Sequence, residues 1–233
     1  MFHANSQSRI LVSGEYGCHC TRKRICVSQL PNSIPVAAGR HFLIRLFLVR
    51  KVHSLSATGV IKFWFEEIDR AQRFKKDPEF DELIRSRFLE LHMRARKGLL
   101  YAWRDDALDA LAEVILLDQF SRNLFRDSAE AFAYDELALV LSQEAIRQKF
   151  DEKLDASKRA FLYMPFMHSE SAEIHKIALY LFDRPGLEDN YNYELRHKAI
   201  IDRFGRYPHR NDLLGRESTS AELEFLAQPG SSF

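Results

Sequence analysis

The spacing of apolar residues changes character near residue 58. From there on, apolar side chains recur at intervals of three and four residues, which is the period that places them on one face of an α-helix. Segment after segment repeats this spacing as far as the C-terminal region. The first such face is formed by Ile61, Trp64, Phe65 and Ile68.

Several polar residues mark where these helices begin and end. Asp77 followed by Pro78 is typical of an N-cap and a first helical residue. Thr219 and Glu222 have the spacing of a capping box. Gly205 suits the left-handed conformation that commonly follows a helix, and Pro165 is expected to end or bend one. The pattern predicts about eight helices of roughly 10–20 residues.

The fold class follows from what this pattern contains. No segment alternates apolar and polar residues as a half-buried strand does, so we predict an all-α domain over residues 58–233. Short connections favour antiparallel neighbours, which indicates helical hairpins assembled into a bundle or superhelix.

Charge separates the chain into two parts. Residues 1–57 contain eight Lys and Arg and one acidic residue, a net charge of +7, whereas the rest contains 26 basic and 32 acidic residues, a net charge of −6. We interpret 1–57 as a basic, disordered extension, either a transit-like targeting segment or sequence upstream of the true start. The three cysteines lie in it, with a spacing that does not match zinc half-sites, so no metal site is predicted.

Composition also restricts the class of partner. The net charge of +1 argues against nucleic-acid binding driven by bulk charge. The apolar run 41–49 contains Arg45 and is too short to span a membrane. We therefore predict a cytoplasmic protein with no nucleic-acid or membrane partner, unless the extension directs it elsewhere.

The stretch LLDQFSRNLFR, residues 116–126, is the first with unusual polar content. Asp118 and Arg122 are four residues apart, on one helical face, and leucine and phenylalanine surround the aspartate. A charge in such a setting requires a partner. One interpretation is a buried structural ion pair, and the other is a ligand site that also includes Asn123 and Arg126.

The stretch FLYMPFMHSE, residues 161–170, ends in His168 and Glu170. A spacing of two residues does not place both side chains on one helical face, so they do not form a helical metal pair. They are either residues near a helix N-terminus or members of a polar site. His175, further along the next helix, is expected to be exposed.

The stretch FGRYPHRN, residues 204–211, carries the densest polar chemistry. His197, on the preceding helix, shares a face with apolar residues and is expected to point inward. After that helix, arginines can bond its free carbonyl groups or grip an acidic ligand by two parallel hydrogen bonds. The polar residues concerned are Arg206, His209, Arg210 and Asn211.

Five motifs occur in an order and spacing that resemble a known family. They are WF at 64–65, the three stretches LLDQFSRNLFR, FLYMPFMHSE and IIDRFGRYPHRN, and the later LGRESTSAELEFL. The region 59–227 is similar to the bacterial domain-of-unknown-function family 924. The resemblance implies an all-α fold of the tetratricopeptide-repeat-like superfamily and no established activity. Ser121 stands where that family commonly has proline.

Three classes of function remain open. In a binding module, Arg122, Arg126, Arg206 and Arg210 would clamp an anionic small molecule or an acidic peptide. In a small enzyme, the histidines and Glu170 would meet in one pocket, with Asp118 orienting a neighbour. In a structural or oligomeric domain, the polar motifs would be internal scaffolding. The cofactor and the oligomeric state are left open. The candidate catalytic residues are His168, Glu170, His197 and His209.

Overall fold

The computed structural model describes residues 56–231. The predicted extension 1–57 and its cysteines therefore lie outside the described residues, apart from the last two positions of that range. Within 56–231 the structure contains helices and turns and no strand, which confirms the all-α prediction. The tetratricopeptide-like repeat stays a prediction. No helix in this part of the chain has the length and apolar character to cross a bilayer.

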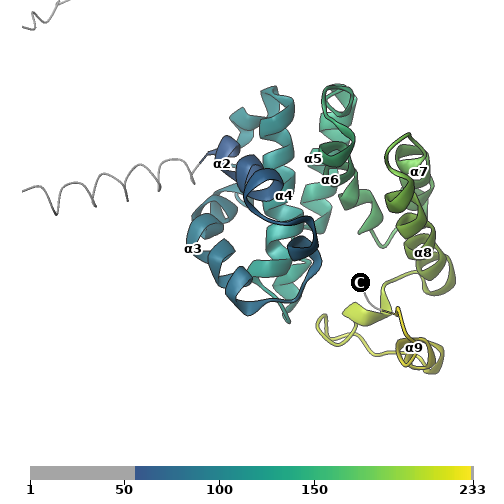
Figure 1. Cartoon of the computed structure of the whole chain (residues 1–233). Coiled ribbons are helices and arrows are strands. Elements are labelled where there is room, and N and C mark those ends of the chain that lie inside the picture. Colours follow the sequence, from purple (N-terminus) through teal and green to yellow (C-terminus); the bar gives the residue numbers. More distant parts are fainter. Residues whose placement is uncertain (1–55, 232–233) are drawn as a thin grey trace, which may run out of the picture. The chain divides into compact units, whose positions relative to one another are not determined.

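Successive helices pack against one another as hairpins, with α4 in contact with α2, α3, α5 and α6, and α7 in contact with α6 and α8 (Figure 1). A π-helical turn, η1, continues α2, and short 3₁₀ turns join most of the others. The elements are α2 Ala57–Lys62, η1 Phe63–Glu67, η2 Arg70–Phe74, α3 Pro78–Ala95, η3 Tyr101–Asp105, α4 Ala107–Leu124, η4 Ala129–Ala131, α5 Asp135–Arg147, η5 Asp151–Lys153, α6 Ala156–Met167, α7 Ala172–Phe182, α8 Glu188–Phe204, η6 Pro208–Arg210 and α9 Ser220–Leu226.

The predicted helix ends are confirmed at three positions. The Asp77 side chain accepts hydrogen bonds from the first backbone amides of α3. Thr219 and Glu222 form the capping box of α9. Gly205 follows α8 with a φ of 69°, in the left-handed region where a glycine avoids steric strain.

Helix α4 is buried on all sides, because four other helices surround it. Its apolar residues form the centre of the core, together with aliphatic residues from α2 and aromatic residues from η1, α3 and α6. Three of its polar side chains, Glu113, Asp118 and Ser121, are also fully buried. Such groups require hydrogen-bonding partners from neighbouring helices, so α4 is the element on which a polar site is built.

Two local expectations need correction. Pro165 lies inside α6, so the alternative that it ends the helix is wrong; the helix gives up one backbone hydrogen bond there and continues to Met167. On α7, His175 was expected to be exposed, but it is fully buried like Ala178 and Leu181, whereas Ile177 is 45% exposed.

Candidate functional site

A buried carboxylate–histidine pair joins α4 to the end of α6. Asp118 Oδ1 lies 2.6 Å from Nδ1 of His168, the residue that follows α6. Arg122 Nη1 is 3.2 Å from the same oxygen, and Gln119 donates to the other at 2.5 Å. Burial alone would raise the pKa of Asp118, but His168, Arg122 and these hydrogen bonds hold it well below its usual value. Asp118 is therefore ionised.

The ionised Asp118 fixes the tautomer of His168. A carboxylate only accepts, so Nδ1 of His168 carries the hydrogen and donates it. Burial lowers the pKa of His168, and this outweighs the attraction of Asp118, so the ring is neutral near pH 7. Its Nε2 lone pair receives no hydrogen bond from any residue within 56–231. The side chain is 16% exposed, which leaves that nitrogen close to solvent.

A second carboxylate, Asp135, lies between two arginines. It is the first residue of α5, and both of its oxygens accept from Arg122 at 3.1 Å. Arg210 Nη1 also donates to Asp135 at 3.1 Å, and its Nη2 donates to the backbone carbonyl of His168 at 3.1 Å. We call Asp118, Arg122, Asp135, His168 and Arg210 the His168 cluster. Its two carboxylates and two guanidinium groups balance, so its net charge is zero while His168 is neutral.

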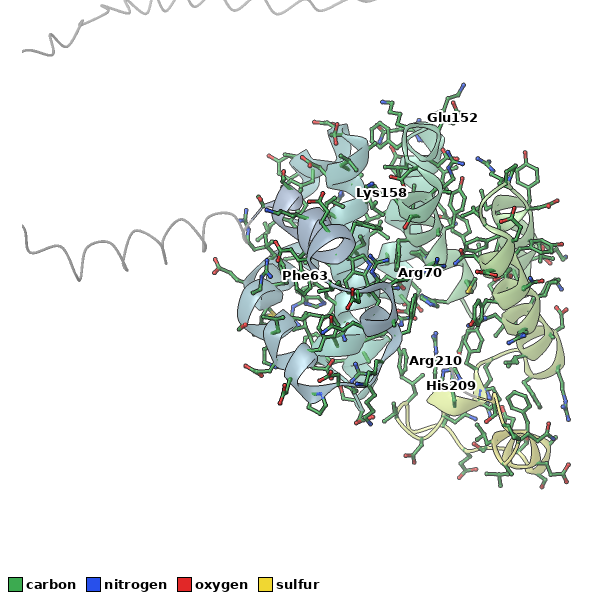
Figure 2. The ribbon with its side chains drawn as sticks, viewed as in Figure 1. Phe63, Arg70, Glu152, Lys158, His209 and Arg210 are labelled. Atoms are coloured by element: carbon green, nitrogen blue, oxygen red, sulfur yellow. The ribbon has the colours of Figure 1, made fainter. Side chains whose placement is uncertain are left out.

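Arg210 projects from η6 toward the helices that carry the rest of the cluster (Figure 2). Its guanidinium carbon lies 4.6 Å from the ring centres of both Phe132 and Tyr207, so two aromatic rings enclose it. The side chain is only 7% exposed, and this burial lowers the pKa of Arg210 from its usual value. Its Nε–H is buried and has no hydrogen-bond partner within 56–231. A buried donor left unbonded is costly, and ordinary structural networks avoid it.

Three further histidines lie around the ring of Tyr207. Its hydroxyl donates to the Met167 carbonyl at 2.5 Å, and burial raises the pKa of this tyrosine. The rings of His175, His197 and His209 have their centres 6.3, 5.8 and 5.6 Å from that of Tyr207. Burial lowers the pKa of His197 to about 3 and that of His209 to about 4. Both are therefore neutral, and the inward orientation predicted for His197 is confirmed.

The burial of His175 corrects the expectation that it is exposed. Its Nδ1 lies 2.6 Å from Oε1 of Glu194, and its Nε2 lies 2.9 Å from the Ser169 carbonyl. A carbonyl only accepts, so Nε2 carries a hydrogen, and one further proton is shared between Nδ1 and Glu194. Burial raises the pKa of Glu194 despite the attraction of His175. The pair is neutral as a whole whichever group holds that proton.

Glu170 and Asn211 hold the loop that follows α8. Both Glu170 oxygens accept from Arg216, at 2.6 and 3.0 Å, and Oε1 also accepts from the Tyr207 amide at 2.8 Å. Asn211 is fully buried, accepts from Arg216 Nε at 3.0 Å and donates to Ser218 at 3.0 Å. Their role is to position Tyr207 and Arg210, because they fix the backbone on which both side chains stand.

The remaining candidates lie in two separate ion pairs. Arg126 and Asn123 both bond Asp81 on α3, at 2.5 to 2.8 Å. Arg206 forms a bidentate pair with Glu222 on α9, at 2.7 and 2.8 Å. The structure thus brings Arg122 and Arg210 together, whereas Arg126 and Arg206 each have a carboxylate elsewhere. Within 56–231 no group of three or more His, Cys, Asp or Glu side chains is arranged to hold a metal ion.

Sequence reasoning missed Asp135, although it holds both arginines of the cluster. In the sequence it reads as an ordinary acidic residue in the first turn of a helix, so no local signal marks it. Phe132 and Arg216 likewise carry no local signal in the sequence that would assign them to the site. His175, by contrast, could have been found, because it shares a helical spacing with Ala178 and Phe182.

Comparison with known proteins assigns the family and no activity. A family model described as "Bacterial protein of unknown function (DUF924)" matches residues 60–230. A solved structure, "Structure of Protein of Unknown Function ATU0120 from Agrobacterium tumefaciens", is 36% identical with a TM-score of 0.70. That similarity covers 73% of this chain and 96% of the other. No curated protein matches the chain.

Proposed function

The chain belongs to the DUF924 family of bacterial proteins of unknown function, and we propose that it binds a small anionic ligand at the His168 cluster. The ligand would present a carboxylate or phosphate oxygen to Arg210 and His168. Arg122 and Asp135 would hold Arg210 in place, and Asp118 would hold His168.

One observation carries this proposal: two polar atoms of the cluster have no hydrogen-bond partner within 56–231 and are free to bond a ligand. They are the buried Nε–H of Arg210 and the Nε2 of His168. The first needs an acceptor, and the second can take up a proton and become a donor. An acidic oxygen would satisfy both. Scaffolding alone does not explain the unbonded Nε–H of Arg210, because buried networks are normally complete.

Charge determines how such a ligand would be held. The cluster is neutral with His168 neutral, so an incoming anion needs one additional positive charge. Protonation of His168 would supply it, and Asp118, 2.6 Å away, would stabilise the resulting imidazolium. Ligand binding would therefore be coupled to the uptake of one proton by His168.

A second function, acid–base catalysis on the bound anion, is favoured by the Asp118–His168 pair itself. A carboxylate bonded to one ring nitrogen orients the other for proton transfer, as in many general bases. Deuterium exchange at the carbon next to the carbonyl of a 2-oxo acid, followed by proton NMR in D₂O, tests it. Exchange that is not faster than in the His168→Gln variant would leave binding as the function.

The binding proposal is tested by calorimetric titration of the full chain with inorganic phosphate and with acetate. We expect saturable binding that is lost in His168→Gln and weakened about tenfold or more in Arg210→Lys, since lysine keeps the charge but lacks the Nε–H. Arg206→Gln is the matched control, because it removes a paired arginine outside the cluster. Binding that is absent, or equal in all four proteins, would refute the proposal.

A further inference from the structure

Two other buried donors lack a hydrogen-bond partner within 56–231, and they occur together. They are the indole Nε1–H of Trp64 and the Nε–H of Arg73. Trp64, in the π-helical turn η1, is fully buried, and Arg73 belongs to the following turn, η2. The Arg73 guanidinium carbon lies 5.8 Å from the centre of the Trp64 ring. The two unbonded donors therefore belong to side chains that are in contact with each other.

The Arg73 guanidinium has aromatic neighbours but no carboxylate partner. It lies 5.2 Å from the ring centre of Phe65 and 5.5 Å from that of Phe161, in addition to Trp64. Burial, and then the nearby positive charge of Arg70, lower the pKa of Arg73. The positive charge of Arg73 is therefore not balanced by an ion pair with a carboxylate of residues 56–231.

Arg87 shows what a charge-balanced arginine looks like in the same part of the fold. It also stacks on two rings, those of Phe63 and Phe88, at 4.5 and 5.1 Å. Unlike Arg73, it donates to a carboxylate, that of Glu67, at 2.7 Å. Aromatic stacking alone thus does not explain why Arg73 has neither an ion pair nor a partner for its Nε–H.

Other positive charges lie close to Arg73. Arg70 precedes it in η2, and Lys158 lies on α6 with its ammonium 5.4 Å from the Phe65 ring centre (Figure 2). Lys158 is paired with Asp155, at the exposed N-terminus of α6. Arg70 and Arg73 form no ion pair with any described residue. Two unbonded donors, one of them on a cationic side chain, favour an anion over a cation as ligand.

We propose that Trp64 and Arg73 form a second anion site, which takes the acidic oxygen of a carboxylate or phosphate group. Each donor would bond an oxygen of this group at about 2.9 Å. The ring of Phe74, 65% exposed, stacks on Phe161 with centres 6.5 Å apart and covers this region. The ligand enters when the η2 turn, with Phe74, moves aside. Single π-helical turns such as η1 are frequent at functional sites.

The test uses the indole N–H of Trp64 as its own reporter. The chain contains two tryptophans, so a full chain labelled with ¹⁵N-tryptophan gives two indole signals, and Trp103→Phe identifies that of Trp64. Sodium acetate and sodium phosphate are titrated separately, with sodium chloride keeping the ionic strength constant. We expect a saturable downfield shift of the Trp64 signal, and the anion that gives it distinguishes a carboxylate from a phosphate ligand.

Two variants complete the test. Arg73→Gln should weaken the saturable shift about tenfold, because it removes a charged donor, and Arg87→Gln should leave it unchanged. The absence of a saturable shift with both anions, or an equal shift in Arg73→Gln, would overturn the proposal. His168→Gln should leave this titration unchanged, so failure of this site and failure of the His168 cluster are distinguishable.

Discussion

The 2.6 Å hydrogen bond between Asp118 and His168 joins two helical elements across 50 positions of sequence and sets the protonation state of both residues. Asp118 is ionised because His168, Arg122 and Gln119 surround it. His168 is neutral with its hydrogen on Nδ1, because Asp118 accepts there. The expected effects of altering these residues follow from that arrangement.

Asp118→Asn should destabilise the protein by about 3 kcal/mol, because it removes one partner from a buried ion pair. Asp127→Asn is the matched control, since Asp127 pairs with Lys76 where both side chains are more than 60% exposed. That change should cost less than about 0.5 kcal/mol. Urea unfolding followed by circular dichroism measures both. Equal effects of the two substitutions would contradict the structural role assigned to Asp118.

Stability should fall as the pH drops from about 6.5 toward 4. Burial lowers the pKa values of His92, His197 and His209 to about 4, 3 and 4, below the unfolded value of about 6.5. In this window the unfolded chain binds more protons, so the stability that is fully present above pH 6.5 is progressively lost. Each histidine contributes a slope of up to about 1.4 kcal/mol per pH unit.

His92→Gln isolates one of these contributions. In the folded protein His92 Nε2 is bonded to Ser121 at 2.8 Å, and burial keeps the ring neutral. The variant should lose stability at neutral pH and show a shallower dependence between about pH 6 and 5. Urea unfolding at several pH values gives both slopes. If the free energy of unfolding depends on pH equally in the variant and the wild type, His92 takes up its proton equally in the folded and unfolded states.

Sulfate binding at the His168 cluster should strengthen as the pH falls from about 7.5 to about 6, by up to about tenfold per unit. Sulfate keeps its charge over this range, so the change comes from proton uptake by the protein. His168, whose pKa is lowered in the free protein, is the group that gains the proton. Calorimetry in two buffers of different ionisation enthalpy counts the protons taken up. In His168→Gln this binding should be lost, and sulfate binding with proton uptake in that variant would assign the effect elsewhere.

Glu194→Ala should cost about 2–4 kcal/mol, because it leaves Nδ1 of the fully buried His175 without a partner. Glu173→Ala removes a carboxylate from the preceding helix, where its pair with Lys176 is more than 60% exposed. That substitution should change stability by less than about 0.5 kcal/mol. Chemical unfolding of both variants tests the comparison. A small effect of Glu194→Ala would mean that solvent replaces the lost oxygen.

The sequence by itself determined the all-α class and several of the helix ends. A period of 3.6 residues and a capping side chain are local properties, because the interacting groups lie within four residues of one another. This is why the caps at Asp77 and Thr219 and the break at Gly205 were predictable. The pairing of Asp118 with Arg122, four residues apart on α4, was predictable for the same reason.

Only the tertiary structure decided which charges meet. Arg210 and Asp135 are 75 positions apart, and Arg126 and Asp81 are 45 apart, so no spacing in the sequence links them. Of the four arginines that the sequence groups by type, Arg122 and Arg210 thereby share Asp135, whereas Arg126 and Arg206 bond other carboxylates. The burial of His175 depends on how α7 packs between α6 and α8. Packing of the helices settles both questions, because it determines which side chains lose water and must find each other.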